Sequence, residues 1–417
     1  MSTAQVQARV PGGARLVALR LFQYTALFGS NVLVARALGP SERAQYALPI
    51  ALMAVVFVIV ELSIEHSSGR ALARRQASLG ELFGVASVLS AGCGLAGAAL
   101  CCLIGLLAAD QLLAGTSFLA VALAAASLPL ALAAKDFGGL LLRVGRFGAF
   151  GVVNAASGAV QLAGVAGFLA GPGLTVERAL AVLLASNAVL AAGSVVCLAQ
   201  ELRRRDHEIA LPPRAVFTRL LRDGVILQGA AIGLFLMFRI DLLIVAVLTN
   251  AKETGLYSLA TSLAEILFVT AAALAQLTLP RLTEDPPDLA ARFVAIFTRR
   301  IVTVSAVGAA VLAAVSYPTI VVLYGHEWKG SVVPLVILAV AAVAITLAWS
   351  VYGYLVREGR LRDISVITLG SLAANIVLNL MLIPLIGIIG AALASLVTYW
   401  ALGLLLALRF RRLAASV

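Results

Sequence analysis

Long apolar stretches separated by short polar breaks run through the whole of this chain. About 20 consecutive apolar residues are enough for a helix to cross a bilayer. The pattern therefore predicts an all-α polytopic membrane protein with about twelve spans. Their approximate bounds are 17–38, 45–65, 82–107, 112–134, 147–170, 179–200, 217–249, 255–279, 294–316, 331–356, 363–384 and 388–409.

Three charged residues, Arg239, Asp241 and Glu265, lie deep inside two neighbouring spans of this set. Counted from the polar break at 250–255, Arg239 lies 11 residues deep in the seventh span and Glu265 lies 10 residues deep in the eighth. At about 1.5 Å per residue, both reach roughly the middle of the bilayer, where a lipid-facing charge costs at least about 2.5–3.5 kcal/mol. We expect them to face each other or a wet cavity. Asp241 follows Arg239 by only two residues and points elsewhere on the helix, so Glu265 is the expected partner.

Composition supports a membrane protein and the charge pattern predicts its orientation. The 417 residues are 62% hydrophobic and 12% charged, whereas a soluble domain is about one quarter charged. When the ends of the spans are assigned alternately to the two sides, 25 of the 31 Lys and Arg residues fall on one side and five on the other, with Arg239 within a span. The basic side is cytoplasmic by the positive-inside rule, so both termini are expected in the cytoplasm. Basic residues at the ends of apolar segments explain the net charge of +11 without a nucleic-acid partner.

The chain is expected to consist of two six-helix halves, 1–205 and 206–417. The longest connection, about 201–218, joins them and contains the run Arg203–Arg205. A shift of 211 residues superimposes Val34 on Val245, Ala35 on Ala246, Glu42 on Glu253, Tyr46 on Tyr257 and Leu48 on Leu259. Six spans per half give both halves the same orientation, so two parallel bundles would enclose a cleft suited to alternating access.

The sequence contains no constellation typical of a metal or cofactor site. The three histidines are scattered, and the four cysteines lie in apolar helices without metal-ligand spacing, which indicates small core residues. No cofactor and no metal are expected.

Several segments resemble those of a known transporter family. The first loop, Val34-Ala-Arg-Ala-Leu-Gly-Pro-Ser-Glu-Arg-Ala-Gln-Tyr46, resembles a signature of the multidrug/oligosaccharidyl-lipid/polysaccharide (MOP) flippase superfamily, and most closely that of its Wzx-type polysaccharide (O-antigen, exopolysaccharide) flippases. One departure is Ala44, where the family usually has glycine. Later segments that resemble the family are Arg239-Ile-Asp241, Gly255-Leu-Tyr257, Pro280, Leu323-Tyr-Gly325 and Asn379–Pro384 followed by Gly387 and Gly390.

The resemblance implies a MATE-like fold and a transporter rather than an enzyme. It implies a flippase that moves a polyprenyl-diphosphate-linked oligosaccharide from the cytoplasmic to the periplasmic leaflet for surface polysaccharide synthesis. It further implies a bacterial inner-membrane location, contact with membrane lipids, and a polymerase or other polysaccharide-assembly proteins as partners.

The candidate site consists of polar and charged residues within spans. A diphosphate crossing hydrocarbon needs a hydrated cationic cavity, and the planar guanidinium of arginine binds its oxygens bidentately. The candidates for the cavity are Arg239, Arg20, Gln228, Tyr24 and Asn31, and those for ion coupling are Asp241 and Glu265. The alternative is structural: an ion pair of Arg239 with Asp241 or Glu265, an interfacial anchor for Arg20, and interhelical hydrogen bonds for Gln228, Tyr24 and Asn31. That second reading is preferred for Asn154, Gln161, Asn187, Asn375 and Asn379.

Two other functions compete with the flippase. A cation-coupled drug or metabolite antiporter of the same superfamily would have a cavity dominated by acids and aromatic residues, and Arg239 argues against it. A membrane glycosyltransferase or polysaccharide polymerase would need a sizeable loop outside the membrane, whereas the predicted external loops are short.

Overall fold

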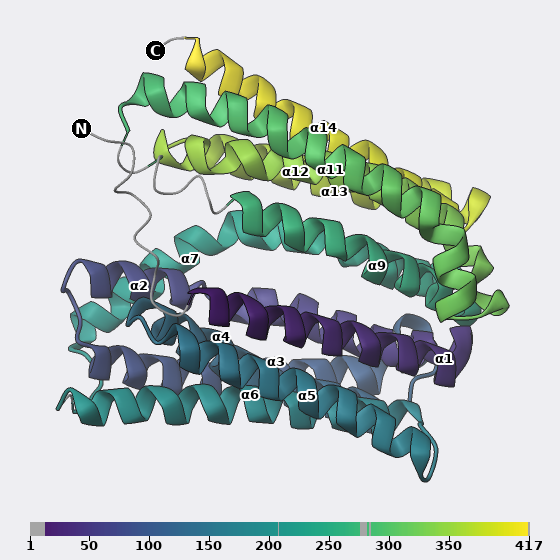
Figure 1. Cartoon of the computed structure of the whole chain (residues 1–417), viewed down its shortest axis with the longest axis horizontal. Helices are drawn as coiled ribbons and strands as arrows, with labels where there is room; N and C mark the ends of the chain where they lie inside the picture. Colours follow the sequence, from purple (N-terminus) through teal and green to yellow (C-terminus); the bar gives the residue numbers. More distant parts are fainter. Residues whose placement is uncertain (1–12, 207, 276–281, 283–284, 416–417) are drawn as a thin grey trace. The chain divides into compact units, whose positions relative to one another are not determined.

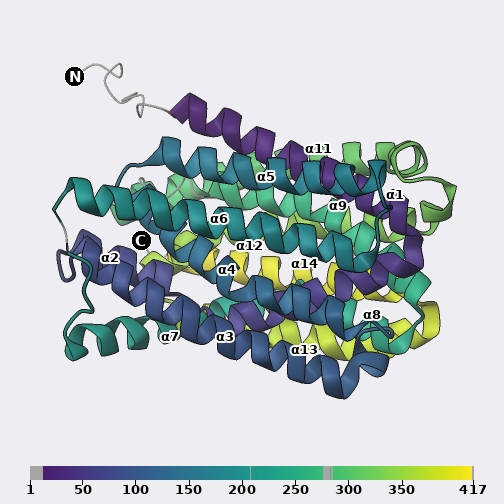
Figure 2. The same cartoon turned by 90° about the horizontal axis from the view of Figure 1, so that it is seen from below.

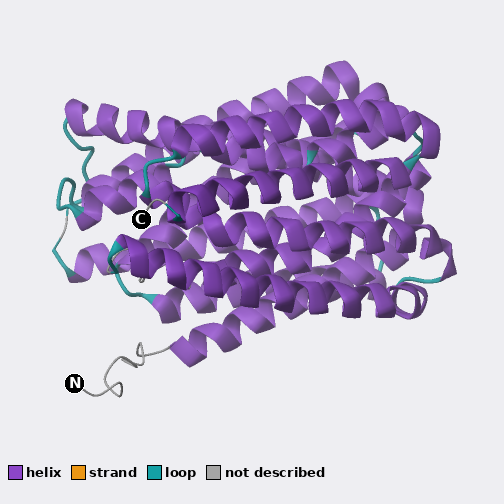
Figure 3. Ribbon diagram, turned by 90° about the horizontal axis from the view of Figure 1, so that it is seen from above, coloured by secondary structure: helices purple, strands orange, loops and turns teal. Residues whose placement is uncertain are grey.

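The computed structural model describes residues 13–206, 208–275, 282 and 285–415, and within these ranges it consists of helices and loops without strands (Figure 3). Nine of the described helices are long and apolar enough to cross a membrane. The prediction of an all-α polytopic membrane fold is confirmed, and about twelve spans are consistent with these helices, because some predicted spans share one helix and one is divided between two.

The elements are labelled in Figure 1. In chain order they are α1 (Gly13–Val60), α2 (Ile64–Ala73), α3 (Leu79–Leu112), α4 (Phe118–Arg143), α5 (Phe147–Ala170), α6 (Val176–Arg204), α7 (Arg214–Met237), α8 (Ile240–Leu248), α9 (Ala251–Ala275), α11 (Pro287–Leu323), η2 (His326–Ser331), α12 (Val332–Arg357), α13 (Leu361–Ile386) and α14 (Ile388–Ala414).

The first two predicted spans form the single helix α1, which turns sharply at Gly39. This residue has φ 67° and ψ 176°, a combination that is open to glycine and strained for other residues. Pro40 follows, and its fixed φ suits the first position of the helix that resumes there. The turn therefore uses Gly39, while Ala44, where the family usually has glycine, is helical and fully buried.

The fourth predicted span, 112–134, is misplaced: α4 begins at Phe118 and continues to Arg143. The prediction ended this span before Lys135 because a charged residue was assigned to a loop. The helix continues because Lys135 forms an ion pair with Glu61 of the segment that follows α1. A paired charge can remain inside a helix bundle, so the charge did not mark a helix end here.

The chain divides into two compact units. Unit 1 comprises Met1–Ala37, Leu52–Leu107 and Ser117–Gln228. Within it α6 packs along both α4 and α5, as Figure 2 also shows, and α2 packs against α4. Leu82, Phe83, Phe137, Leu141 and Leu198 lie in its buried core.

Unit 2 comprises Leu38–Ala51, Ala108–Thr116 and Gly229–Val417. Its central helix, α12, packs along α9, α11 and α14. Small residues allow this close packing: a Cβ on Gly403 of α14 would lie 2.6 Å from the carbonyl oxygen of Ala344 on α12. The two units are defined by contacts, whereas the expected boundary at 205/206 separates two sequence repeats, and that boundary stays a prediction.

Candidate functional site

The seventh predicted span, 217–249, is broken in the middle. Helix α7 ends at Met237 and α8 begins at Ile240, so Phe238 and Arg239 lie between two helices. The backbone N–H groups of these two residues donate to carbonyls three residues earlier, at 3.1 and 3.0 Å, which tightens the last turn. The expectation of one continuous helix was wrong here.

Side chains of other helices stabilise the break. The hydroxyl of Tyr399 on α14 donates to the Met237 carbonyl oxygen at 3.1 Å, which satisfies a backbone acceptor that no lipid could. The ring of Phe238 stacks on Phe268 with centroids 5.2 Å apart and meets Tyr399 edge to face at 5.4 Å. The break contains no glycine or proline, so these tertiary contacts are what stabilises it.

Arg239 forms the ion pair that the sequence predicted. Its Nη1 lies 2.6 Å from Oε1 of Glu265 on α9, and its Nη2 lies 3.2 Å from Oε2, so the contact is bidentate. The Arg239 and Glu265 side chains are 29% and 31% exposed, and Nε of Arg239 has no hydrogen-bond partner in the described chain. The guanidinium also lies over the ring of Phe235, 5.9 Å from its centroid. Because both side chains are partly exposed, a further anion can approach the guanidinium.

Asp241 points away from this pair, as expected, and is buried. Its Oδ1 accepts from the Leu242 N–H at 2.8 Å. Its Oδ2 accepts from the hydroxyl of Tyr257 at 2.6 Å and from that of Ser395 at 3.3 Å. The carboxylate is thus solvated by neutral donors from α8, α9 and α14.

In unit 1, Arg20 on α1 is surrounded by neutral acceptors. Its Nη1 donates to Oε1 of Gln23 at 2.8 Å and to Oδ1 of Asn154 on α5 at 2.6 Å, and its Nη2 donates to the Tyr24 hydroxyl at 2.7 Å. The guanidinium lies over the rings of Tyr24 and Phe150, 4.9 and 5.5 Å from their centroids. Among the described residues no carboxylate pairs with it. The surroundings orient the cation and leave its charge uncompensated.

Asn31 and Gln228, the other two cavity candidates, differ in their contacts. The Oδ1 atom of Asn31 is buried without a hydrogen-bond partner in the described chain. Gln228 is 3% exposed; its amide donates to the carbonyl oxygen of Val58, and its Oε1 accepts from the Ser63 hydroxyl. Gln228 therefore satisfies backbone and side-chain groups where the chain leaves α1 for α2.

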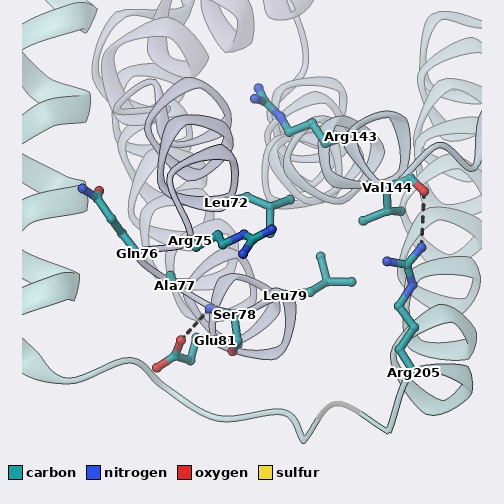
Figure 4. A pocket seen from close by; sticks show the side chains of 10 residues that line it. All are labelled: Leu72, Arg75, Gln76, Ala77, Ser78, Leu79, Glu81, Arg143, Val144 and Arg205. Carbon is teal, nitrogen blue, oxygen red and sulfur yellow. Dashed lines mark hydrogen bonds between the residues drawn. The ribbon is translucent and has the colours of Figure 1, made fainter.

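Basic residues from three separate connections gather at one end of unit 1. Arg75 follows α2, Arg143 ends α4 and Arg205 follows α6, and all three line a pocket of about 690 Å³ (Figure 4). The Arg205 Nη2 donates to the Val144 carbonyl oxygen at 3.5 Å, and the Ser78 N–H donates to Oε2 of Glu81 at 2.7 Å. These connections were all assigned to the basic side of the membrane, and the structure brings them together.

Arg43, from the first-loop signature, belongs to the interior of unit 2. It is 2% exposed, and its Nε and Nη1 have no hydrogen-bond partner in the described chain. The guanidinium lies 5.4 Å from the centroid of the Tyr46 ring. Burial raises the pKa of the nearby Tyr324 to about 12, so this phenol stays neutral and does not balance the charge.

Sequence reasoning gave too little weight to polar residues on α4 and α6. Besides the ion pair of Lys135 with Glu61, Glu65 on α2 lies 3.8 Å from the guanidinium of Arg143. Glu65 and Lys135 line a second cavity of unit 1 together with Asn187 of α6. The sequence alone does not show which helix a polar residue of a spanning helix faces. This group of residues could therefore be recognised only from the structure.

A family comparison places the chain. Residues 11–284 match the model of a family described as polysaccharide biosynthesis protein. The chain belongs to this family. No curated protein sequence matches it. Pro280, one of the residues on which the resemblance was based, lies outside the described residues.

Three solved structures are similar to this chain, and two of them are described as transporters of the MOP superfamily. The lipid II flippase MurJ in an inward closed conformation is 13% identical with a TM-score of 0.75, over 96% of this chain and 89% of that one. An inward-facing MATE multidrug transporter is 16% identical with a TM-score of 0.69, over 94% and 96%. A MOP superfamily transporter from Pyrococcus furiosus is 14% identical with a TM-score of 0.67, over 96% and 94%. At these identities the likeness establishes the fold, which is MATE-like as expected.

Proposed function

We propose that this protein flips a polyprenyl-diphosphate-linked oligosaccharide across the membrane by alternating access. The observation that carries the proposal is the guanidinium of Arg20, which three neutral side chains hold near the start of the first spanning helix, with no carboxylate partner among the described residues. An uncompensated cation in an apolar medium is costly, and a bound anion repays that cost. A diphosphate with an apolar tail is an anion that reaches such a place from within the bilayer.

Arg239 is the second cation of the proposed path. It is paired with Glu265, yet its side chain is 29% exposed and its Nε is unpartnered in the described chain. Broken spanning helices are common at the binding sites of transporters, because their free backbone groups and side chains line a cavity. A diphosphate would compete with Glu265 for the guanidinium, so binding would release the carboxylate to accept a cation.

Asp241 and Glu265 are the proposed coupling groups. Acidic residues inside membrane spans often carry protons or bind ions. Asp241 is buried and solvated by hydroxyls, and Glu265 is partly exposed beside the substrate-binding cation. In this proposal an H⁺ or Na⁺ gradient drives the cycle through one or both carboxylates.

The direction of transport is proposed to be from the cytoplasmic to the periplasmic leaflet of a bacterial inner membrane. The clustering of Arg75, Arg143 and Arg205 at one end of unit 1 supports a basic side, and basic loops remain in the cytoplasm. In this arrangement both termini are cytoplasmic. A polymerase that consumes the flipped unit is the proposed protein partner.

The test is surface polysaccharide in cells that carry variants at single arginines. Arg20→Ala and Arg239→Ala are expected to abolish surface polysaccharide while lipid-linked precursor accumulates and protein levels stay normal. Arg36→Ala is the matched control, because Arg36 is an exposed arginine at the other end of the same stretch of α1. Normal polysaccharide in both the Arg20 and the Arg239 variants would refute the proposal. Drug sensitivity without loss of polysaccharide would favour the antiporter.

A further inference from the structure

A small polar cavity lies within unit 1 among α2, α4, α5 and α6. Its volume is about 270 Å³, and its polar lining is Glu65, Lys135, Asn154 and Asn187, with the ring of Phe150 beside them. Pockets for complete small molecules measure about 300–1,000 Å³. This cavity therefore has the size for a single ring and not for a chain of several.

Asn187 is the cavity residue that most directly points to a ligand. It lies near the middle of α6 and makes no side-chain hydrogen bond within the described part of the chain. Asn154, in contrast, accepts from Arg20 and donates to the Phe150 carbonyl oxygen at 2.8 Å. Asn187 is half-buried and lines the cavity, so its free donors and acceptor are open to a polar molecule inside it.

The charges around the cavity are balanced. The Lys135 ammonium pairs with Glu61, and the Glu65 carboxylate lies 3.8 Å from the Arg143 guanidinium. No excess of cations is left to attract a phosphate into the cavity. Carboxylate, ammonium and amide groups together offer both donors and acceptors, which is what the hydroxyl groups of a sugar require, since each hydroxyl both donates and accepts.

The cavity adjoins the cation that is proposed to bind the diphosphate. Asn154 lines the cavity, and its Oδ1 accepts from Nη1 of Arg20 at 2.6 Å. In a polyprenyl-diphosphate-linked glycan, the first sugar is bonded directly to the diphosphate. We infer that this cavity holds that first sugar while Arg20 holds the diphosphate, an inference that rests on the proposed function.

Gly139 of α4 leaves room for the side chain of Glu65, which forms one wall of the cavity. A Cβ at this position would lie 2.5 Å from Cγ of Glu65 and 2.9 Å from its Oε1. Gly139→Ala would therefore displace the Glu65 side chain and leave Arg20 and Asn154 in place. This substitution alters the cavity without removing a polar group.

The experiment measures binding to the purified full chain in lipid nanodiscs. The probes are a short polyprenyl diphosphate without sugar and the same lipid that carries one glucose, one galactose or one N-acetylglucosamine. We expect at least one sugar to raise affinity over the bare diphosphate. Asn187→Leu and Gly139→Ala are expected to reduce that gain about tenfold and to leave binding of the bare diphosphate unchanged. Arg20→Ala is expected to weaken binding of every probe.

Gln161→Leu is the matched control for Asn187→Leu. Gln161 is a buried amide on α5 of the same unit, and it is not part of the cavity lining. It should keep the full gain from the sugar, and thermal unfolding of all variants reports whether they are folded. A gain that persists in both Asn187→Leu and Gly139→Ala, or that falls equally in Gln161→Leu, overturns the inference.

The design separates this inference from the proposed function. A wild-type protein that binds the bare diphosphate but gains nothing from any of the three sugars overturns the sugar site alone. A wild-type protein that binds neither the bare nor the sugar-bearing lipids overturns the flippase proposal and the sugar site with it.

Discussion

Arg239 and Glu265 lie 26 residues apart in the chain and meet through two parallel contacts, Nη1 to Oε1 at 2.6 Å and Nη2 to Oε2 at 3.2 Å. They lie on opposite sides of the turn at 249–250, where α8 ends at Leu248 and α9 begins at Ala251. This ion pair connects the break between α7 and α8 to α9, and it brings a cation and an acid into direct contact.

The first prediction concerns the two members of this pair. Glu265→Gln should lower the free energy of unfolding by about 1–3 kcal/mol, because it leaves the part-buried Arg239 without a counter-charge. The exchange Arg239→Glu with Glu265→Arg should restore much of that stability but not transport, since the cation then stands on α9. Thermal unfolding and surface polysaccharide measure the two effects separately. Transport by the exchanged pair at the wild-type level would show that the position of the cation is unimportant.

The second prediction concerns the Tyr399 hydroxyl, which donates to the backbone at the break between α7 and α8. Tyr399→Phe should cost about 1–2 kcal/mol of stability, because the Met237 carbonyl oxygen loses its donor in an apolar environment. Tyr354→Phe is the control, because the Tyr354 hydroxyl is buried without a hydrogen-bond partner in the described chain and its removal should cost nothing. Unfolding midpoints in detergent compare the two. Equal midpoints would mean that the Tyr399 contact adds no stability.

The third prediction concerns the close approach of α9 to the turn in α1. A Cβ on Gly255 would lie 1.7 Å from the carbonyl oxygen of Pro40, and backbone cannot move aside as a side chain can. Gly255→Ala should therefore cost about 3 kcal/mol or more and reduce the amount of folded protein. Gly370→Ala on α13 meets nothing within 4 Å and should be neutral or slightly stabilising. Folded yield by size-exclusion chromatography distinguishes the two.

The fourth prediction concerns the buried carboxylate. Asp241→Asn keeps the shape and one acceptor, so the protein should fold, but it removes the charge that the proposal couples to an ion gradient. Transport of lipid-linked substrate in vesicles should then no longer respond to an imposed H⁺ or Na⁺ gradient. Tyr257→Phe, which leaves the charge in place and removes a hydrogen bond of 2.6 Å, should retain that response. An unchanged response in Asp241→Asn would exclude this residue from coupling.

Hydropathy and helix geometry account for much of what could be predicted. The apolar stretches identified the spanning helices, and residue counting from the polar break identified Glu265 as the partner of Arg239. Both inferences depend on the regular rise of a helix, which is the same in every sequence. The placement of Arg75, Arg143 and Arg205 at one end of unit 1 likewise follows from alternation of the spans.

The features that escaped prediction depend on residues distant in the chain. The break at Phe238 has no glycine or proline to mark it, and Tyr399 that supports it lies 162 residues after Met237. Lys135 has the sequence character of a loop residue, and its partner Glu61 lies 74 residues earlier in the chain. A single sequence does not reveal such partners, because helix packing decides them.

The bond between Tyr399 and the Met237 carbonyl has a mechanical consequence. It connects the C-terminal end of α7 to α14, so a translation or rotation of α14 would also move that end of α7. Arg239 stands two residues beyond Met237 and would be reoriented by the same motion. A ligand or lipid that binds α14 would thereby change the affinity for the anion without contacting the anion-binding site itself.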